Sequence, residues 1–67
     1  MVVVEQKVRF DVFKDIKMVD RTPCIVTGTV YDVNYAHKVF HVEYEMAGTK
    51  QRTSFKFSDI GEKVRVV

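Results

Sequence analysis

An alternating pattern over residues 39–46 most constrains how this chain can fold. Every second position is apolar and polar side chains fall between; the apolar ones are Phe40, Val42, Tyr44 and Met46. A period of two is typical of a β-strand with one buried face. After a break around Gly48 comes a second stretch, residues 50–57, in which the apolar side chains Phe55 and Phe57 again lie two positions apart. The two stretches therefore predict a β-hairpin.

The position of the hairpin turn follows from the requirement that the apolar side chains of both strands share one face. A loop of Gly48 and Thr49 meets this requirement, because Val42 then lies opposite Phe55. A three-residue loop would instead set the buried face of one strand against the polar face of the other. Gly48 at the first loop position also suits a type II′ turn. We therefore predict a two-residue loop at Gly48 and Thr49.

The end of the sequence predicts a short plug and a closing strand. Ser58 or Asp59 suits the start of a single 3₁₀ turn near residues 58–61, with Ile60 directed into the core. Residues 63–67 alternate again and predict a last strand.

The first half of the sequence leaves more alternatives open. Residues 2–5 fit either a short strand paired with residues 64–67 or a frayed end. Residues 7–19 fit one strand, two strands divided near residue 14, or a helix, and their valine and phenylalanine content favours strands. The proline in residues 20–23 predicts a break. Residues 25–33 predict a further strand, with a bulge or bend at Gly28.

Length and composition indicate one small domain, residues 1–67. The net charge of +2 is only mildly basic, and the chain does not reach the isoelectric point above about 9 that is typical of a dedicated nucleic-acid-binding domain. The chain has a single cysteine, Cys24, so it cannot form an internal disulfide, and this fits a reducing cytosol. We expect Cys24 to be a small buried side chain at the start of a strand. No apolar run approaches the roughly 20 residues of a membrane span. We therefore expect a cytoplasmic protein that makes no use of a membrane.

Three stretches resemble SH3-like barrels of the KOW and Tudor kind. They are residues 28–33 (GTVYDV), residues 40–44 (FHVEY) and residues 57–60 (FSDI). This resemblance implies an all-β fold, a small SH3-like barrel of about five strands with a one-turn 3₁₀ helix near residues 58–61. Residues 54–61 also resemble small uncharacterised proteins of phages and mobile elements in Gram-positive bacteria. The predicted core consists of Phe10, Ile25, Val33, Phe40, Val42, Tyr44, Phe55, Phe57, Ile60 and Val64.

Three groups of residues could in principle bind a metal or act in catalysis, but they are better interpreted as structural. His37 and His41 lack the further ligands of a tetrahedral metal site. Cys24 lacks an orienting partner for a nucleophile. Glu43 and Glu45 lie on a solvated strand face. We therefore expect no catalytic residue, no metal and no cofactor, and the protein is not expected to be an enzyme.

The candidate ligand-binding residues are aromatic and basic side chains in the middle of the chain: Tyr31, Tyr35, His37, Lys38, His41, Arg52 and Lys56. SH3-like domains bind RNA, DNA or peptides through the loops at one end of the barrel, so the resemblance implies an interaction module.

Interleaved acidic residues and the balanced charge favour a protein or peptide partner over nucleic acid. In the alternative, a nucleic-acid-binding domain, Tyr35 would stack on bases while Lys38, Arg52 and Lys56 contact phosphates. We expect a monomer, or a weak homodimer through an exposed strand edge, and the second resemblance implies a phage or mobile-element accessory protein.

Overall fold

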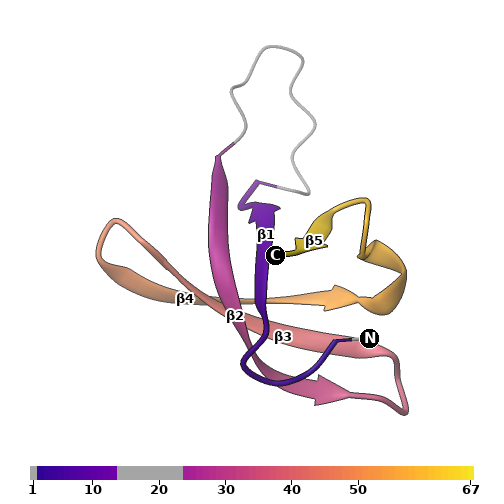
Figure 1. Cartoon of the computed structure of the whole chain (residues 1–67). Helices are drawn as coiled ribbons and strands as arrows, with labels where there is room; N and C mark the ends of the chain where they lie inside the picture. Colours follow the sequence, from indigo (N-terminus) through magenta and orange to yellow (C-terminus); the bar gives the residue numbers. More distant parts are fainter. Residues whose placement is uncertain (1, 14–23) are drawn as a thin grey trace.

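The structure of this protein is a computed structural model that describes residues 2–13 and 24–67. Five strands form one antiparallel sheet in the order β4-β3-β2-β1-β5 (Figure 1). The strands are β1 Lys7–Asp11, β2 Ile25–Asn34, β3 Val39–Met46, β4 Thr49–Lys56 and β5 Val64–Val66, and a 3₁₀ turn, η1 Phe57–Asp59, follows β4. The prediction of an all-β fold of about five strands with a one-turn 3₁₀ helix is confirmed.

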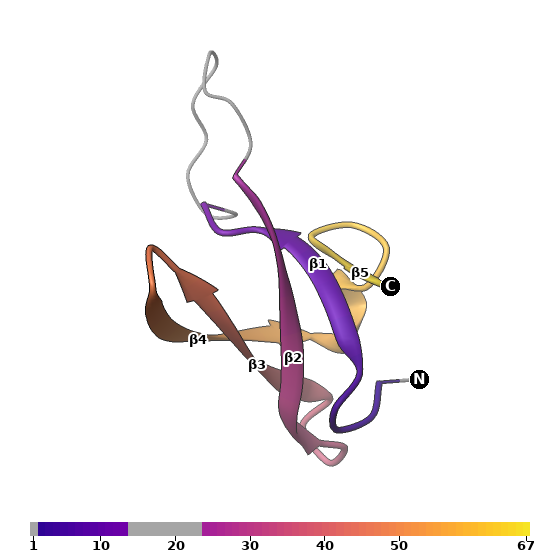
Figure 2. The same cartoon turned by 60° about the vertical axis from the view of Figure 1, so that its left-hand side comes forward.

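The sheet is not closed into the predicted barrel. β4 and β5 stand at its two ends, and neither is hydrogen-bonded to the other in the described part of the chain. The sheet is nevertheless strongly twisted and bent, because β3 and β4 run across the direction of β1 (Figures 1 and 2). It therefore folds over one core, and among residues 2–13 and 24–67 no strand lies beside the outer edge of β4 or of β5.

The core lies on the concave side of the bent sheet. The buried apolar side chains are Val2, Val8, Phe10, Val30, Phe40, Val42, Phe55 and Val64. The ring of Phe55 lies at the centre, with its centroid 5.1 Å from that of Phe10 and 5.7 Å from that of Phe40. Of the predicted core, five members are buried as expected, and Val33, Tyr44 and Phe57 are half-buried against the cluster.

Two members of the predicted core, Ile25 and Ile60, are instead 54% and 36% exposed. Counting back from Val33 in steps of two places Ile25 on the buried face. That count is wrong because the pairing of β2 with β3 shifts between Val30 and Asp32, so a bulge interrupts the alternation. At the other site, Phe57 at the start of η1 packs against the core in place of Ile60.

The bulge in β2 therefore lies at Tyr31 and not at Gly28, where the sequence predicts it. Gly28 marks a close approach of two strands instead. A Cβ atom on Gly28 would lie 2.5 Å from Cγ1 of Val42 and 3.0 Å from the carbonyl oxygen of Glu43. Glycine is needed here because β3 passes so near to β2.

The β3–β4 loop has two residues, as predicted, but it lies one position earlier, at Ala47 and Gly48 rather than at Gly48 and Thr49. Phe55 consequently lies opposite Phe40, two positions from its predicted partner. Both loop residues have positive φ, 53° and 77°, as a type I′ turn requires. Since the pairing moves by two residues, every side chain keeps its face, and the requirement for a shared apolar face did not exclude this alternative.

Residues 2–5 form neither the predicted strand nor a frayed end: a turn at residues 4–5 is closed by a hydrogen bond from the N–H of Gln6 to the carbonyl of Val3, at 3.2 Å. The strand that pairs with β5 is β1, and Val2 is buried. The helix interpretation is wrong for residues 7–11, which form β1. The predicted break at residues 20–23 lies outside the described residues. In the described part of the chain no helix is long and apolar enough to cross a membrane.

Candidate functional site

The seven residues predicted to bind a ligand fall into two groups. The first group projects from the sheet on the face opposite to the core: Tyr31 from β2, His41 from β3, and Arg52 and Lys56 from β4. The second group, Tyr35, His37 and Lys38, lies in the connection between β2 and β3.

Tyr31 lies at the centre of the first group. Its ring centroid is 6.0 Å from that of His41, and the guanidinium carbon of Arg52 lies 5.0 Å from the same ring centroid. That distance is within the range of a cation–π interaction. The bulge at Tyr31 explains these contacts, because a bulge changes the direction of the side chain it carries. Beyond the bulge the pairing resumes with Asp32 opposite His41. Tyr31 is still 39% exposed, so part of its ring is available to a partner.

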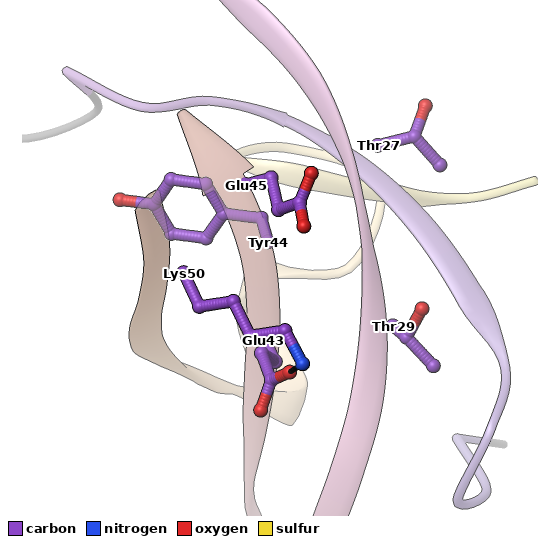
Figure 3. A pocket seen from close by; sticks show the side chains of 6 residues that line it. All are labelled: Thr27, Thr29, Glu43, Tyr44, Glu45 and Lys50. Carbon is purple, nitrogen blue, oxygen red and sulfur yellow. Dashed lines mark ion pairs between the residues drawn. The ribbon is translucent and has the colours of Figure 1, made fainter. Parts of the chain in front are cut away.

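Glu43 forms ion pairs with two basic side chains of β4, and one of them, Arg52, lies beside this ring. Its carboxylate oxygens lie 3.6 Å from Nζ of Lys50 and 3.5 Å from Nε of Arg52. Figure 3 shows the first of these ion pairs. Because both basic side chains are largely exposed, such pairs contribute little stability, about 0–1 kcal/mol each. The guanidinium of Arg52 thus contacts the Glu43 carboxylate and the Tyr31 ring together.

His41 contacts β4 directly. Its Nδ1 lies 2.7 Å from Oγ of Ser54, within hydrogen-bonding distance. We name the set Tyr31, His41, Glu43, Arg52 and Ser54 the outer-face cluster. It joins three neighbouring strands through side chains alone, on the surface that faces solvent.

A hollow of about 290 Å³ shares Glu43 with the outer-face cluster. Figure 3 shows the side chains that line it. Its lining is mostly polar: Thr27, Thr29, Glu43, Tyr44, Glu45 and Lys50. The hydroxyl of Thr29 accepts a hydrogen bond from Nζ of Lys7, at 2.7 Å. Ligand pockets for small molecules are mostly apolar and enclosed, so this hollow is better suited to single side chains of a docked chain.

The free edge of β4 runs next to the same cluster. The N–H of Phe57 donates to the carbonyl of Lys38, 2.9 Å, and hydrogen bonding in an antiparallel pair alternates along the strand. Even-numbered residues of β4 therefore direct their N–H and C=O groups away from β3. The N–H of Lys56 donates to Oδ2 of Asp59, 2.9 Å, in agreement with this alternation.

The backbone N–H groups of Lys50, Arg52 and Ser54 consequently point to a side of β4 where the described residues place no strand. Unpaired N–H and C=O groups in a row are a template for pairing with another chain. β4 therefore carries an open backbone edge of three successive outward-directed residues, with the outer-face cluster beside it.

The second predicted group has local structural contacts. The hydroxyl of Tyr35 donates to the carbonyl of Val2, at 3.0 Å, and its ring centroid is 6.0 Å from that of Phe57. The backbone N–H of His37 donates to Oδ1 of Asn34, at 3.0 Å. These contacts do not join the second group to the outer-face cluster.

Sequence reasoning did not include Glu43, Lys50 or Ser54 in the candidate site. The alternation of β3 and β4 already places all three on the outer face, which is the signal that could have identified them. Cys24 is half-buried before β2, and its N–H lies 3.4 Å from Oδ1 of Asp11. Within residues 2–13 and 24–67, no group of three or more His, Cys, Asp or Glu side chains could hold a metal ion.

Comparisons of the chain with protein-family models, curated proteins and solved structures find no match. The function of the site therefore has to be inferred from its own geometry.

Proposed function

We propose that this protein is a non-catalytic interaction module that binds an extended peptide segment of a protein partner along β4. The observation that carries the proposal is the open backbone edge of β4, formed by Lys50, Arg52 and Ser54. In strand addition, main-chain hydrogen bonds to such an edge supply affinity, and contacts of alternate side chains supply specificity. β4 is eight residues long, which is enough for several successive pairs of hydrogen bonds.

The outer-face cluster supports the same proposal. An added strand extends the sheet, so every second side chain of the peptide falls on the outer face next to Arg52 and Ser54. The partly exposed ring of Tyr31 and the guanidinium of Arg52 then offer an aromatic and a planar cationic surface. Tyrosine and arginine are enriched where protein interfaces concentrate their binding energy.

The charge of β4 favours an acidic partner. Its outward side chains are Lys50, Arg52, Ser54 and Lys56, and opposite charges directly across two strands attract while like charges repel. A peptide with acidic residues at alternate positions matches this pattern. A homodimer in which β4 pairs with β4 sets basic side chains near basic ones, so we propose a monomer with a different protein as partner. The resemblance of residues 54–61 implies an accessory protein of a phage or mobile element as the biological setting.

Amide-resolved NMR titration tests this proposal with two synthetic peptides, one alternating glutamate and valine and one alternating lysine and valine. We expect the glutamate peptide to shift the amides of Lys50, Arg52 and Ser54. Ser54→Pro removes an outward N–H and should weaken binding at least about tenfold, whereas Ser54→Ala keeps the N–H and should bind nearly as the natural chain does. Unchanged binding by Ser54→Pro, or equal binding of both peptides, would contradict the proposal.

A further inference from the structure

We propose that a second surface, at the junction of β1 and β5, binds a phosphate-type oxyanion. Arg9 of β1 and Arg65 of β5 are directly paired across the two strands. Both residues are exposed, and neither forms an ion pair with another described residue. Like charges directly opposite one another on neighbouring strands repel. An anion bound between the two guanidinium groups would offset the repulsion between the arginines, because each guanidinium group is attracted to the anion.

A hollow of about 300 Å³ lies at this pair, and its lining supplies a third cation. The lining residues are Arg9, Phe10, Asp11, Ile25, Glu62, Lys63 and Arg65. Lys63 immediately precedes β5. Three cations against two carboxylates leave the hollow positive. Ile25, which is 54% exposed, gives it an apolar wall.

The two carboxylates do not neutralise the arginine pair. Oδ1 of Asp11 already accepts the N–H of Phe13 at 3.0 Å and lies 3.4 Å from the N–H of Cys24. It is thereby held by the backbone at the end of β1. Glu62 lies in the turn before β5, where its N–H donates to the carbonyl of Asp59, and its carboxylate forms no ion pair with a described residue.

The geometry favours phosphate over a carboxylate ligand. Arginine presents a planar fork of N–H donors that matches two oxygens of a phosphate, and lysine adds a point charge. A phosphate group has enough oxygens to satisfy two guanidinium forks and one ammonium group together, whereas a carboxylate has two oxygens. The site is distinct from the β4 edge, and its occupancy does not depend on peptide binding there.

NMR titration of the full chain with sodium phosphate, compared with sodium chloride at equal ionic strength, tests the site. We expect saturable amide shifts at Arg9, Lys63 and Arg65 in phosphate only, with a Kd in the millimolar range of about 1–10 mM. Arg9→Gln should remove them. Lys7→Gln, which removes the same charge at a residue of β1 that does not line the hollow, should leave them unchanged. Arg9→Lys keeps the charge but not the fork, so it should bind phosphate at least about fivefold more weakly.

A short single-stranded oligonucleotide then distinguishes the two sources of phosphate. If nucleic-acid backbone phosphates occupy the site, the same amides shift. The slope of log K against log salt then falls in Arg9→Gln by about 0.7 for each phosphate that this variant no longer neutralises. If only inorganic phosphate shifts them, the site takes a small phosphorylated ligand. Equal shifts in chloride and phosphate, or shifts that persist in the Arg9→Gln/Arg65→Gln variant, overturn the proposal.

Discussion

Gly28 is a residue whose identity is dictated by packing. A side chain at this position would collide with Val42, which is fully buried, and with the backbone of β3. Either the Val42 side chain or the strand would have to move, and overpacking of this kind is destabilising. We therefore expect Gly28→Ala to lower the free energy of unfolding by about 1–3 kcal/mol, measured by urea denaturation.

Gly48→Asn is the matched control. The space around Gly48 is open for 4 Å, and asparagine tolerates its φ of +77° better than other side chains do. The control should therefore lose less than about 1 kcal/mol. Equal losses at the two glycines would contradict the explanation by crowding at Gly28.

Burial of single residues could be predicted from the sequence only where the alternation was unbroken. In β3 the period of two correctly identified Phe40 and Val42 as core residues. In β2 the same rule wrongly placed Ile25 in the core, because the bulge at Tyr31 adds one residue to the strand. No glycine lies at this bulge to indicate it in the sequence. The contact of Tyr31 with His41 and Arg52 depends on this bulge, so this contact could not be predicted from the sequence.

At the scale of the element, the β3–β4 turn offers a stabilising substitution. Ala47 has a φ of 53°, in the left-handed region that costs an L-residue with a Cβ about 1–2 kcal/mol. Asparagine followed by glycine is the preferred type I′ pair. We expect Ala47→Asn to stabilise the protein by about 0.5–1 kcal/mol and to raise its Tm by several degrees, about 2–8 °C, in thermal unfolding.

Thr49→Asn distinguishes this turn from the one predicted by the sequence. In the structure Thr49 is the first residue of β4, where asparagine is unfavourable. A loop at Gly48 and Thr49 would instead accept asparagine at its second position. Stabilisation by Thr49→Asn together with no gain from Ala47→Asn would therefore show that the turn lies one position later.

At the scale of the whole molecule, the segment before β1 closes one end of the core. Val2 is 1% exposed, whereas Val3 and Val4 are 48% and 52% exposed. The Tyr35 hydroxyl donates to the Val2 carbonyl, and the N–H of Glu5 donates to the carbonyl of Val30 at 2.7 Å. We expect Val2→Ala to cost about 1–3 kcal/mol of unfolding free energy in urea denaturation.

Val3→Ala and Val4→Ala are the controls for this prediction. Both side chains are largely exposed, so each change should stay within about 0.5 kcal/mol. The same small effect at all three valines would mean that the segment does not close the core. Three consecutive valines look alike in the sequence, and the contacts with Tyr35 and β2 decide which of them is inside.

Local sequence patterns likewise could not predict whether the sheet closes into a barrel. Alternation and turn residues predicted the β3–β4 hairpin and the 3₁₀ turn, because these depend on a few neighbouring residues. Whether β4 meets β5 depends on the twist and tilt of all five strands together. The open edge of β4, on which the proposed function rests, is a property of this global geometry.

The pairing of β1 with β5 also sets the order in which this fold can be completed during protein synthesis. β1 leaves the ribosome before the other four described strands, yet one of its two neighbours in the sheet is β5, the last of these four. At about 5–20 residues per second, several seconds separate the two. Over that interval one edge of β1 has no partner strand. The nascent chain therefore cannot bury Val8 and Phe10 completely until Val64 has emerged.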